Sequence, residues 1–221
     1  TCQPINFSIF NPNLANNVYK MEPAKLQFSP HEMKLVGNAD WILTKNEILG
    51  KIGRLLGGLN VMQKEIVNSF PQSLPEEILA TTAKISRGEN YKGLPYLVLD
   101  YPRLFTKGNI FAVRSMFWWG RTMSTTLHLS GRWQKHFAAT ILANHEVLAE
   151  DNSVIATGEN EWEHDVTGDG YAPVNSLTKK YFEELISGRP FLKISLFADV
   201  NELANGPEVW ASQFNKIIKL L

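Results

Sequence analysis

The sequence predicts an α+β fold, a single domain with a mostly antiparallel central sheet and helices from both ends of the chain packed on it. Segments with strand-like alternation cluster in the middle of the 221 residues, and segments with helical periodicity cluster toward the two ends. That order favours α+β over the regular strand–helix alternation of a parallel sheet. No repeat or linker interrupts the chain, so one domain over residues 1–221 is expected.

The N-terminal half is expected to begin with an irregular lead-in over residues 1–37, which is rich in proline and asparagine. A long helix is predicted over residues 40–70, where apolar side chains recur at steps of three and four and Thr44 with Glu47 forms a capping-box pattern. A second helix is predicted over residues 73–88, with Ser73 at its start.

The middle and C-terminal segments then supply the sheet and the closing helices. Apolar and alternating runs predict strands, and 3.6-residue periodicity with capping residues predicts helices. The expected strands cover residues 94–102, 109–119, 122–130, 153–166 and 191–200. The expected helices cover residues 132–149, 175–188 and 206–221.

The hairpin over residues 109–130 has an expected register, because Gly120 and Arg121 suit a two-residue type II′ turn. That turn would place Arg114 on one face of the hairpin, with Trp118 and Leu127. The other face would carry the aromatic, hydroxyl and imidazole side chains of Trp119, Ser124, Thr126 and His128.

The bulk composition limits the partners that can be expected. The chain has 22 basic and 22 acidic residues, so its net charge gives no reason to expect nucleic acid. No uncharged apolar run reaches the about 18 residues of a membrane span, so no membrane partner is expected. The one cysteine, Cys2, cannot form an internal disulfide, which fits a reducing, cytoplasmic location. Self-association into a homo-oligomer stays open.

The balanced net charge hides two opposed blocks. Residues 84–135 hold nine basic and two acidic residues, a net of +7, whereas residues 136–178 hold eight acidic and no Lys or Arg residues, a net of −8. The basic block could be a surface that binds anions, or the two blocks could lie side by side and neutralise each other. The sequence leaves both interpretations open.

Arg114 is the first candidate for a ligand-binding residue, because it interrupts an apolar strand. A charge in that position must be paired or reach solvent. It could form a structural pair with Asp100, an acid in another apolar strand, or line a pocket for an anion. Together with Trp119, Thr126 and His128, it forms our candidate set for a small anionic or aromatic ligand near the central sheet. The expected hairpin register conflicts with that set, because it separates Arg114 from His128.

The second candidate site is the acidic stretch from Glu159 to Asp165. If this stretch is a strand, alternate acids point the same way at about 7 Å spacing, which suits a general acid and base. A hydrolase or metal-dependent enzyme would then use Glu161, Glu163, His164 and Asp165 as catalytic residues. The same pattern is also typical of a solvated strand face.

Motifs of known chemistry give no further candidate. His145 and Glu146 begin a zinc-protease pattern, but Ala149 stands where the second histidine must be. The turn from Asp165 to Gly170 resembles half of a calcium loop without its closing glutamate. The sequence therefore assigns no metal ligand and identifies no cofactor. A purely structural or partner-binding role is the third hypothesis.

Overall fold

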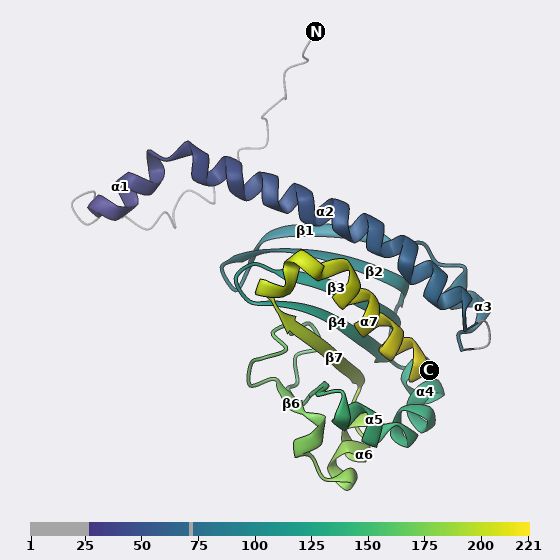
Figure 1. Cartoon of the computed structure of the whole chain (residues 1–221). Coiled ribbons are helices and arrows are strands. Elements are labelled where there is room, and N and C mark those ends of the chain that lie inside the picture. Colours follow the sequence, from purple (N-terminus) through teal and green to yellow (C-terminus); the bar gives the residue numbers. More distant parts are fainter. Residues whose placement is uncertain (1–26, 71–72) are drawn as a thin grey trace, which may run out of the picture. The chain divides into compact units, whose positions relative to one another are not determined.

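The computed structural model describes residues 27–70 and 73–221 (Figure 1). The chain forms two compact units, residues 1–45 and residues 46–221, and helix α2 (Ala39–Asn68) runs through the boundary between them. The division of the chain into domains stays a prediction. Expectations for residues 1–26, including Cys2 and most of the irregular lead-in, lie outside the described residues.

The first unit contains helix α1 (Pro30–Val36), which lies within the segment that was expected to be irregular. Ser29 caps this helix, and the side chain of Glu32 returns a hydrogen bond to the backbone of Ser29. The expectation for residues 30–36 is therefore wrong. Its physical reason is a complete capping box with proline at the first helical position, which outweighs the nearby prolines.

The described part of the second unit contains a seven-stranded sheet in the order β1-β2-β3-β4-β7-β5-β6, and every recorded strand pair is antiparallel. The α+β class and the antiparallel central sheet are thus confirmed. The strands are β1 (Lys84–Tyr91), β2 (Leu94–Thr106), β3 (Asn109–Trp118), β4 (Thr122–Ser130), β5 (Val154–Ala156), β6 (Tyr171–Pro173) and β7 (Phe191–Asp199).

Helices from both ends of this unit pack against the sheet, as expected, and share one core with it (Figure 1). From α2, the buried side chains Leu49, Ile52, Leu56 and Leu59 contribute at helical spacing. The other helices are α3 (Glu76–Leu79), α4 (Arg132–Ala143), α5 (His145–Glu150), α6 (Lys179–Ser187), α7 (Gly206–Lys219) and the 3₁₀ helices η3 (Val174–Ser176) and η4 (Val200–Asn205).

The prediction of a helix over residues 73–88 is wrong. Only α3 is helical there, and strand β1 begins at Lys84. β1 pairs with β2 from Lys84 opposite Asp100 to Gly88 opposite Tyr96. A Cβ atom at Gly88 would lie 2.4 Å from the Tyr96 ring. This glycine therefore serves a close approach inside the sheet rather than the end of a helix, and strand pairing overrides the local helix signals.

The strand expected over residues 153–166 is also wrong beyond its first residues. β5 ends at Ala156, and residues 157–170 form a loop without strand pairing, here called the 157–170 loop. The backbone carbonyls of Thr157 and Gly158 accept from the Arg189 guanidinium, and the backbone N–H groups of both residues donate to the carbonyl of Gly170. The acids of this segment therefore do not share a strand face.

The β3–β4 hairpin forms as expected, but with its register shifted by one residue. Three residues, 119–121, connect the strands, and Gly120 adopts a left-handed φ of 64°. Phe117 consequently pairs with Met123, and Arg114 pairs with Thr126. A one-residue shift moves side chains to the opposite face. Arg114 and His128 therefore lie on the same face, and the expected conflict between them is wrong.

Candidate functional site

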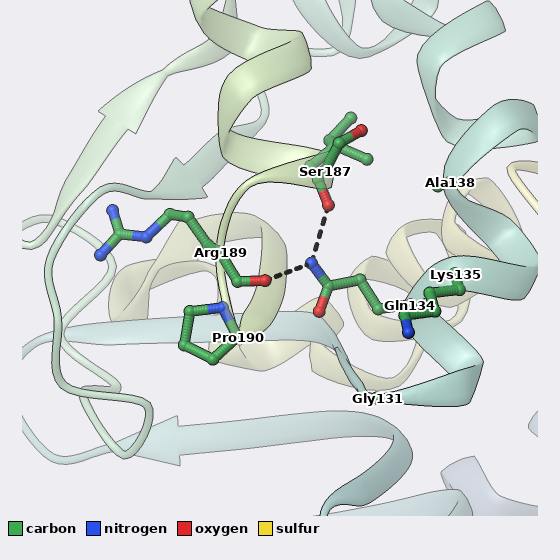
Figure 2. Close-up of a pocket in the computed structure, with 8 residues that line it drawn as sticks. Gly131, Gln134, Lys135, Ala138, Ser187, Arg189 and Pro190 are labelled. Atoms are coloured by element: carbon green, nitrogen blue, oxygen red, sulfur yellow. Dashed lines mark hydrogen bonds between the residues drawn. The ribbon is translucent and has the colours of Figure 1, made fainter.

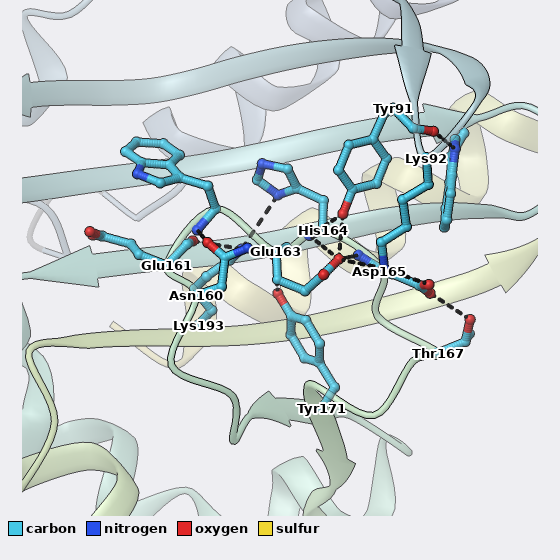
Figure 3. A network of polar contacts seen from close by, with 12 residues as sticks. Tyr91, Lys92, Asn160, Glu161, Glu163, His164, Asp165, Thr167, Tyr171 and Lys193 are labelled. Atoms are coloured by element: carbon cyan, nitrogen blue, oxygen red, sulfur yellow. Dashed lines mark hydrogen bonds and ion pairs between the residues drawn. The ribbon is translucent and has the colours of Figure 1, made fainter.

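The second face of the sheet, opposite the main helical core, carries a network of polar side chains beneath the 157–170 loop (Figure 3). The register places ionisable and hydroxyl side chains next to one another across four strands. Asp100 lies opposite Arg114, which lies opposite Thr126, and Thr126 lies opposite Ser195. His128 lies opposite Lys193. We call this surface the polar face.

Arg114 and Asp100 form the ion pair that the sequence suggested. Nε of Arg114 donates to one carboxylate oxygen of Asp100 at 2.7 Å, and Nη2 donates to the other at 2.9 Å. The Asp100 side chain is buried, whereas 19% of the Arg114 side chain is exposed. This two-point contact satisfies the carboxylate and fixes the plane of the guanidinium. Its third nitrogen, Nη1, remains available for another partner.

His164 of the 157–170 loop is that partner. Nη1 of Arg114 lies 2.9 Å from Nε2 of His164. On its other side, Nδ1 of His164 lies 3.4 Å from Nζ of Lys193. Lys193 also donates to the backbone carbonyls of Glu161, at 3.2 Å, and Glu163. Arg114 and Lys193 thus hold the loop to two different strands of the sheet.

His128 and Glu161 form a second connection between sheet and loop. Nε2 of His128 lies 2.9 Å from a carboxylate oxygen of Glu161. The edge of the His128 ring meets Trp162, with centroids 5.6 Å apart, and also meets Phe191. Trp162 is 51% exposed. An imidazole with one nitrogen bound to a carboxylate therefore lies next to a solvent-exposed indole.

Glu163 and Asp165 are held at the β1–β2 turn. The Tyr91 hydroxyl donates to Glu163 and accepts the backbone N–H of His164 at 2.7 Å. Nζ of Lys92 lies 3.1 Å from a carboxylate oxygen of each acid. In these contacts a residue of the basic block pairs with the acidic block, as one interpretation of the charge pattern expected.

The bases inside the network are disfavoured as cations. Burial, followed by the positive charges of Lys193 and Arg114, lowers the pKa of His128 to about 3. Burial and the same two cations, with His128, lower the pKa of His164 to about 2. Burial and Arg114 also lower the pKa of Lys193 to about 7. At neutral pH both imidazoles are uncharged, so Nε2–H of His128 donates to Glu161 as a neutral group.

The structure brings most of the sequence-derived candidates together. Arg114 and His128, from one candidate set, lie in the same network as Glu161, Glu163, His164 and Asp165, from the other. Thr126 joins them, with its hydroxyl 2.8 Å from that of Ser195. Trp119 does not, because its ring contacts Phe117 and packs on the main core.

The sequence interpretation missed Lys193, Tyr91 and Tyr171. The Tyr171 hydroxyl donates to the Glu163 carbonyl at 3.0 Å, which ties the loop to β6. The signal for Lys193 was present, because a lysine inside the apolar run from Phe191 to Phe197 poses the same problem as Arg114. No comparable signal marks the two tyrosines.

Three pockets formed by described residues lie beside the network. One of about 340 Å³ lies between α4 and the turn after α6, where Nε2 of Gln134 donates to the carbonyls of Ile186 and Arg189 (Figure 2). Another of about 580 Å³ shares Arg189 and reaches Glu159 and Phe191. A third of about 440 Å³ lies between β7 and α7. Neither candidate ligand set lines these three pockets.

Within residues 27–70 and 73–221, no group of three or more His, Cys, Asp and Glu side chains is placed to hold a metal ion. None of the helices in the same ranges combines the length and apolar character needed to cross a bilayer.

No protein-family model, curated protein or solved structure matches this chain.

Proposed function

We propose that the protein binds a small anionic ligand on the polar face, with Arg114, Thr126 and His128 among its contacts. The observation that carries the proposal is the group of basic side chains gathered there. Arg114, Lys193 and two imidazoles lie close together, with the carboxylate of Asp100 already paired to Arg114 and the carboxylates of Glu161 and Glu163 supplied by the 157–170 loop. Burial, and after it the neighbouring positive charges, lower the pKa values of His128, His164 and Lys193. A bound anion would raise these pKa values and favour the protonated forms of the three bases.

The geometry also supports a planar group on the ligand. The exposed Trp162 indole lies beside His128 and offers a face on which a ring can stack. Arg114, whose side chain is 19% exposed, lies on the same face of the sheet. An aromatic carboxylate or a phosphorylated ring compound therefore fits the proposal better than a bare sugar.

The test is calorimetric titration with inorganic phosphate, nucleotides, aromatic carboxylates and sugars. The key variant combines Arg114→Met with Asp100→Leu, so that neither charge is left buried alone. Arg132→Met is the matched control, since Arg132 is an exposed arginine paired with Glu77. An anion that binds the wild type and the control but not the double variant supports the proposal. Equal binding to all three proteins would overturn it.

Acid–base catalysis is a second candidate, favoured by the contact between His128 and Glu161. A carboxylate orients the imidazole through Nε2, and Nδ1 has no recorded partner among the described residues. An imidazole oriented in this way can act as a general base toward a substrate if the bound substrate raises its low pKa. Hydrolysis of a chromogenic ester or glycoside, lost in both His128→Gln and Glu161→Gln, would support this role. The metal-dependent form of the hypothesis gains no support from the described residues.

Association with another chain is favoured by a different observation in the first unit. Several large apolar side chains of its described part are exposed, namely Phe28, Met33, Leu35, Val36, Trp41, Ile42 and Leu43. Analytical sedimentation at several protein concentrations tests this role. A molecular mass that stays at the monomer value at every concentration would contradict self-association. The proposed cytoplasmic location rests on the low cysteine content alone.

A further inference from the structure

Among the described residues, Lys193 makes three hydrogen-bonding contacts, and all three are with the 157–170 loop. Its Nζ atom reaches the carbonyl oxygens of Glu161 and Glu163 and lies 3.4 Å from Nδ1 of His164. The residue is 1% exposed. Because water hardly reaches its amine, the protonation state of Lys193 depends on these three neighbouring groups.

The contact with Arg114 determines which nitrogen of His164 carries the proton. A guanidinium has donors but no acceptor, so Nη1 of Arg114 must donate to Nε2 of His164. A neutral imidazole then bears its hydrogen on Nδ1, the nitrogen that faces Lys193. The group that meets this N–H must offer a lone pair.

The donor and acceptor counts match an amine and not an ammonium. An ammonium has three N–H donors and no lone pair, and its third hydrogen would meet the N–H of His164. An uncharged amine has two N–H donors and one lone pair. The two donors satisfy the carbonyls of Glu161 and Glu163, and the lone pair accepts from Nδ1 of His164.

We infer that Lys193 is held as an uncharged amine and that this amine latches the 157–170 loop onto the polar face. Protonation of the amine removes its lone pair and sets two N–H groups against each other, which increases the fraction of molecules in which the loop is open. Release would uncover the face on which Arg114, Thr126 and His128 lie. The latch does not depend on the proposed ligand.

The charged and titratable groups around Lys193 come from every element packed on it. Arg114 on β3 opposes protonation, while Glu161 and Glu163 of the loop favour it. His128 on β4 is the cross-strand neighbour, and the Tyr171 ring on β6 lies 5.7 Å from Nζ. Burial outweighs the two acids, in keeping with the pKa of about 7 for Lys193.

Lys92 provides a matched contrast, because it contacts the same loop with the opposite chemistry. It binds the carboxylates of Glu163 and Asp165 at the exposed edge. Although its partial burial acts in the opposite direction, these two acids raise its pKa. The latch therefore predicts that Lys193 and Lys92 lose their protons at widely different pH.

The first experiment is an NMR titration of the full chain carrying ¹³C at the lysine ε-carbons, whose shift reports the charge on each amine. Lys193→Met identifies the Lys193 signal. We expect that signal to titrate near pH 7, more than two units below Lys92. A Lys193 midpoint at the ordinary value of 10.5 would overturn the inference. If Lys193→Met does not fold, the wild-type spectra decide by whether any lysine titrates near pH 7.

The second experiment measures hydrogen exchange of the 157–170 loop from pH 9 to pH 6, corrected for the intrinsic pH dependence of exchange. If one proton is taken up on opening, the open population should rise about tenfold for each pH unit as pH falls from 9 toward the Lys193 midpoint near 7, and should level off below it. Lys92→Met should keep this dependence and Lys193→Met should lose it. A loop whose protection is independent of pH, despite a low Lys193 midpoint, would refute the latch.

Discussion

The two faces of the central sheet are covered by different kinds of structure. The main core packs large apolar side chains from α2, α4 and α7 against the strands. Two buried hydrogen bonds between side chains join these helices to the sheet, from Gln63 to Ser115 and from Thr125 to Gln213, both 3.0 Å. The polar face is covered by the 157–170 loop, held through Arg114, His128 and Lys193.

The apolar face is the main source of stability, whereas the polar face is where a functional site is expected. Burying apolar area stabilises at about 25 cal/mol per Å², without requiring particular partners. Burying His128, His164 and Lys193 opposes stability, because each must stay uncharged where an exposed base would hold a proton more readily. Groups of this kind are characteristic of functional sites, which directs attention to the polar face.

The largest effect should come from the apolar face. Phe111 is fully buried in the main core and contacts the rings of Trp133 and Phe137. Phe111→Ala should lower the free energy of unfolding by about 3–5 kcal/mol, because it removes the buried ring and leaves a cavity. Urea denaturation measures this loss. A cost under about 1 kcal/mol would contradict the assignment of this face as the source of stability.

The Arg114–Asp100 pair should give the next largest effect. Asp100→Ala leaves the guanidinium without its carboxylate and should cost about 3 kcal/mol, whereas Asp100→Leu with Arg114→Met should recover most of that loss. The reason is that one buried charge without its partner destabilises the folded state more than the removal of both charges does. The same urea measurement compares the two variants. A double variant as unstable as the single one would show that the pair itself provides the stability.

Acid should destabilise the folded protein through its histidines. An unfolded chain binds protons on both imidazoles below the ordinary pKa of 6.5, whereas the folded protein keeps His128 and His164 neutral down to about pH 3. Since the unfolded state binds more protons in this window, the free energy of unfolding falls as pH falls from 6.5 toward 3. The doubly substituted His128→Gln, His164→Gln chain should show a flatter profile in urea titrations at successive pH values. An equally steep profile in that variant would assign the loss to other groups.

A smaller effect should follow from breaking a polar contact inside the apolar face. Ser115→Ala removes the acceptor of the Gln63 amide, whose Oε1 already has no partner among the described residues. The expected loss is about 1–2 kcal/mol, and Gln63→Met in the same chain should restore most of it. Thermal unfolding of both variants checks this. No difference between them would mean that another acceptor, such as water, replaces the serine.

The smallest change in stability should come from Trp162→Ala on the polar side. Because Trp162 is half exposed, its loss should change the free energy of unfolding by no more than about 0.5 kcal/mol. The same variant should weaken binding of an aromatic anion, measured by calorimetry. Retained affinity would remove Trp162 from the proposed ligand contacts while leaving the role of Arg114 in place.

The sequence was sufficient for the elements that apolar periodicity defines. The helix expected over residues 40–70 is α2, and the closing helix expected from residue 206 is α7. The strands on either side of Gly120 were also expected, as was the ion pair of Arg114 with Asp100. Each of these predictions follows from burial. A helix or strand with one apolar face must pack that face against another element, and a charged side chain within the face needs a partner.

The predictions from sequence are wrong where contacts with residues distant in the chain override the local sequence pattern. The acids from Glu159 to Asp165 alternate as in a strand, but Arg189, more than twenty residues later, binds the carbonyls before them. The hairpin register depended on whether its connection holds two or three residues, which Gly120 alone does not decide. That single residue of shift determines whether Arg114 and His128 can share a ligand.

The most direct test of the central claim is a backbone NMR titration of the ¹⁵N-labelled protein with whichever phosphate or aromatic carboxylate binds most tightly. If the polar face is the binding surface, shift changes will concentrate at Arg114, Thr126, His128 and the 157–170 loop. Changes confined to the pocket beside Gln134, or no saturable change with any of these anions, would contradict the proposed function.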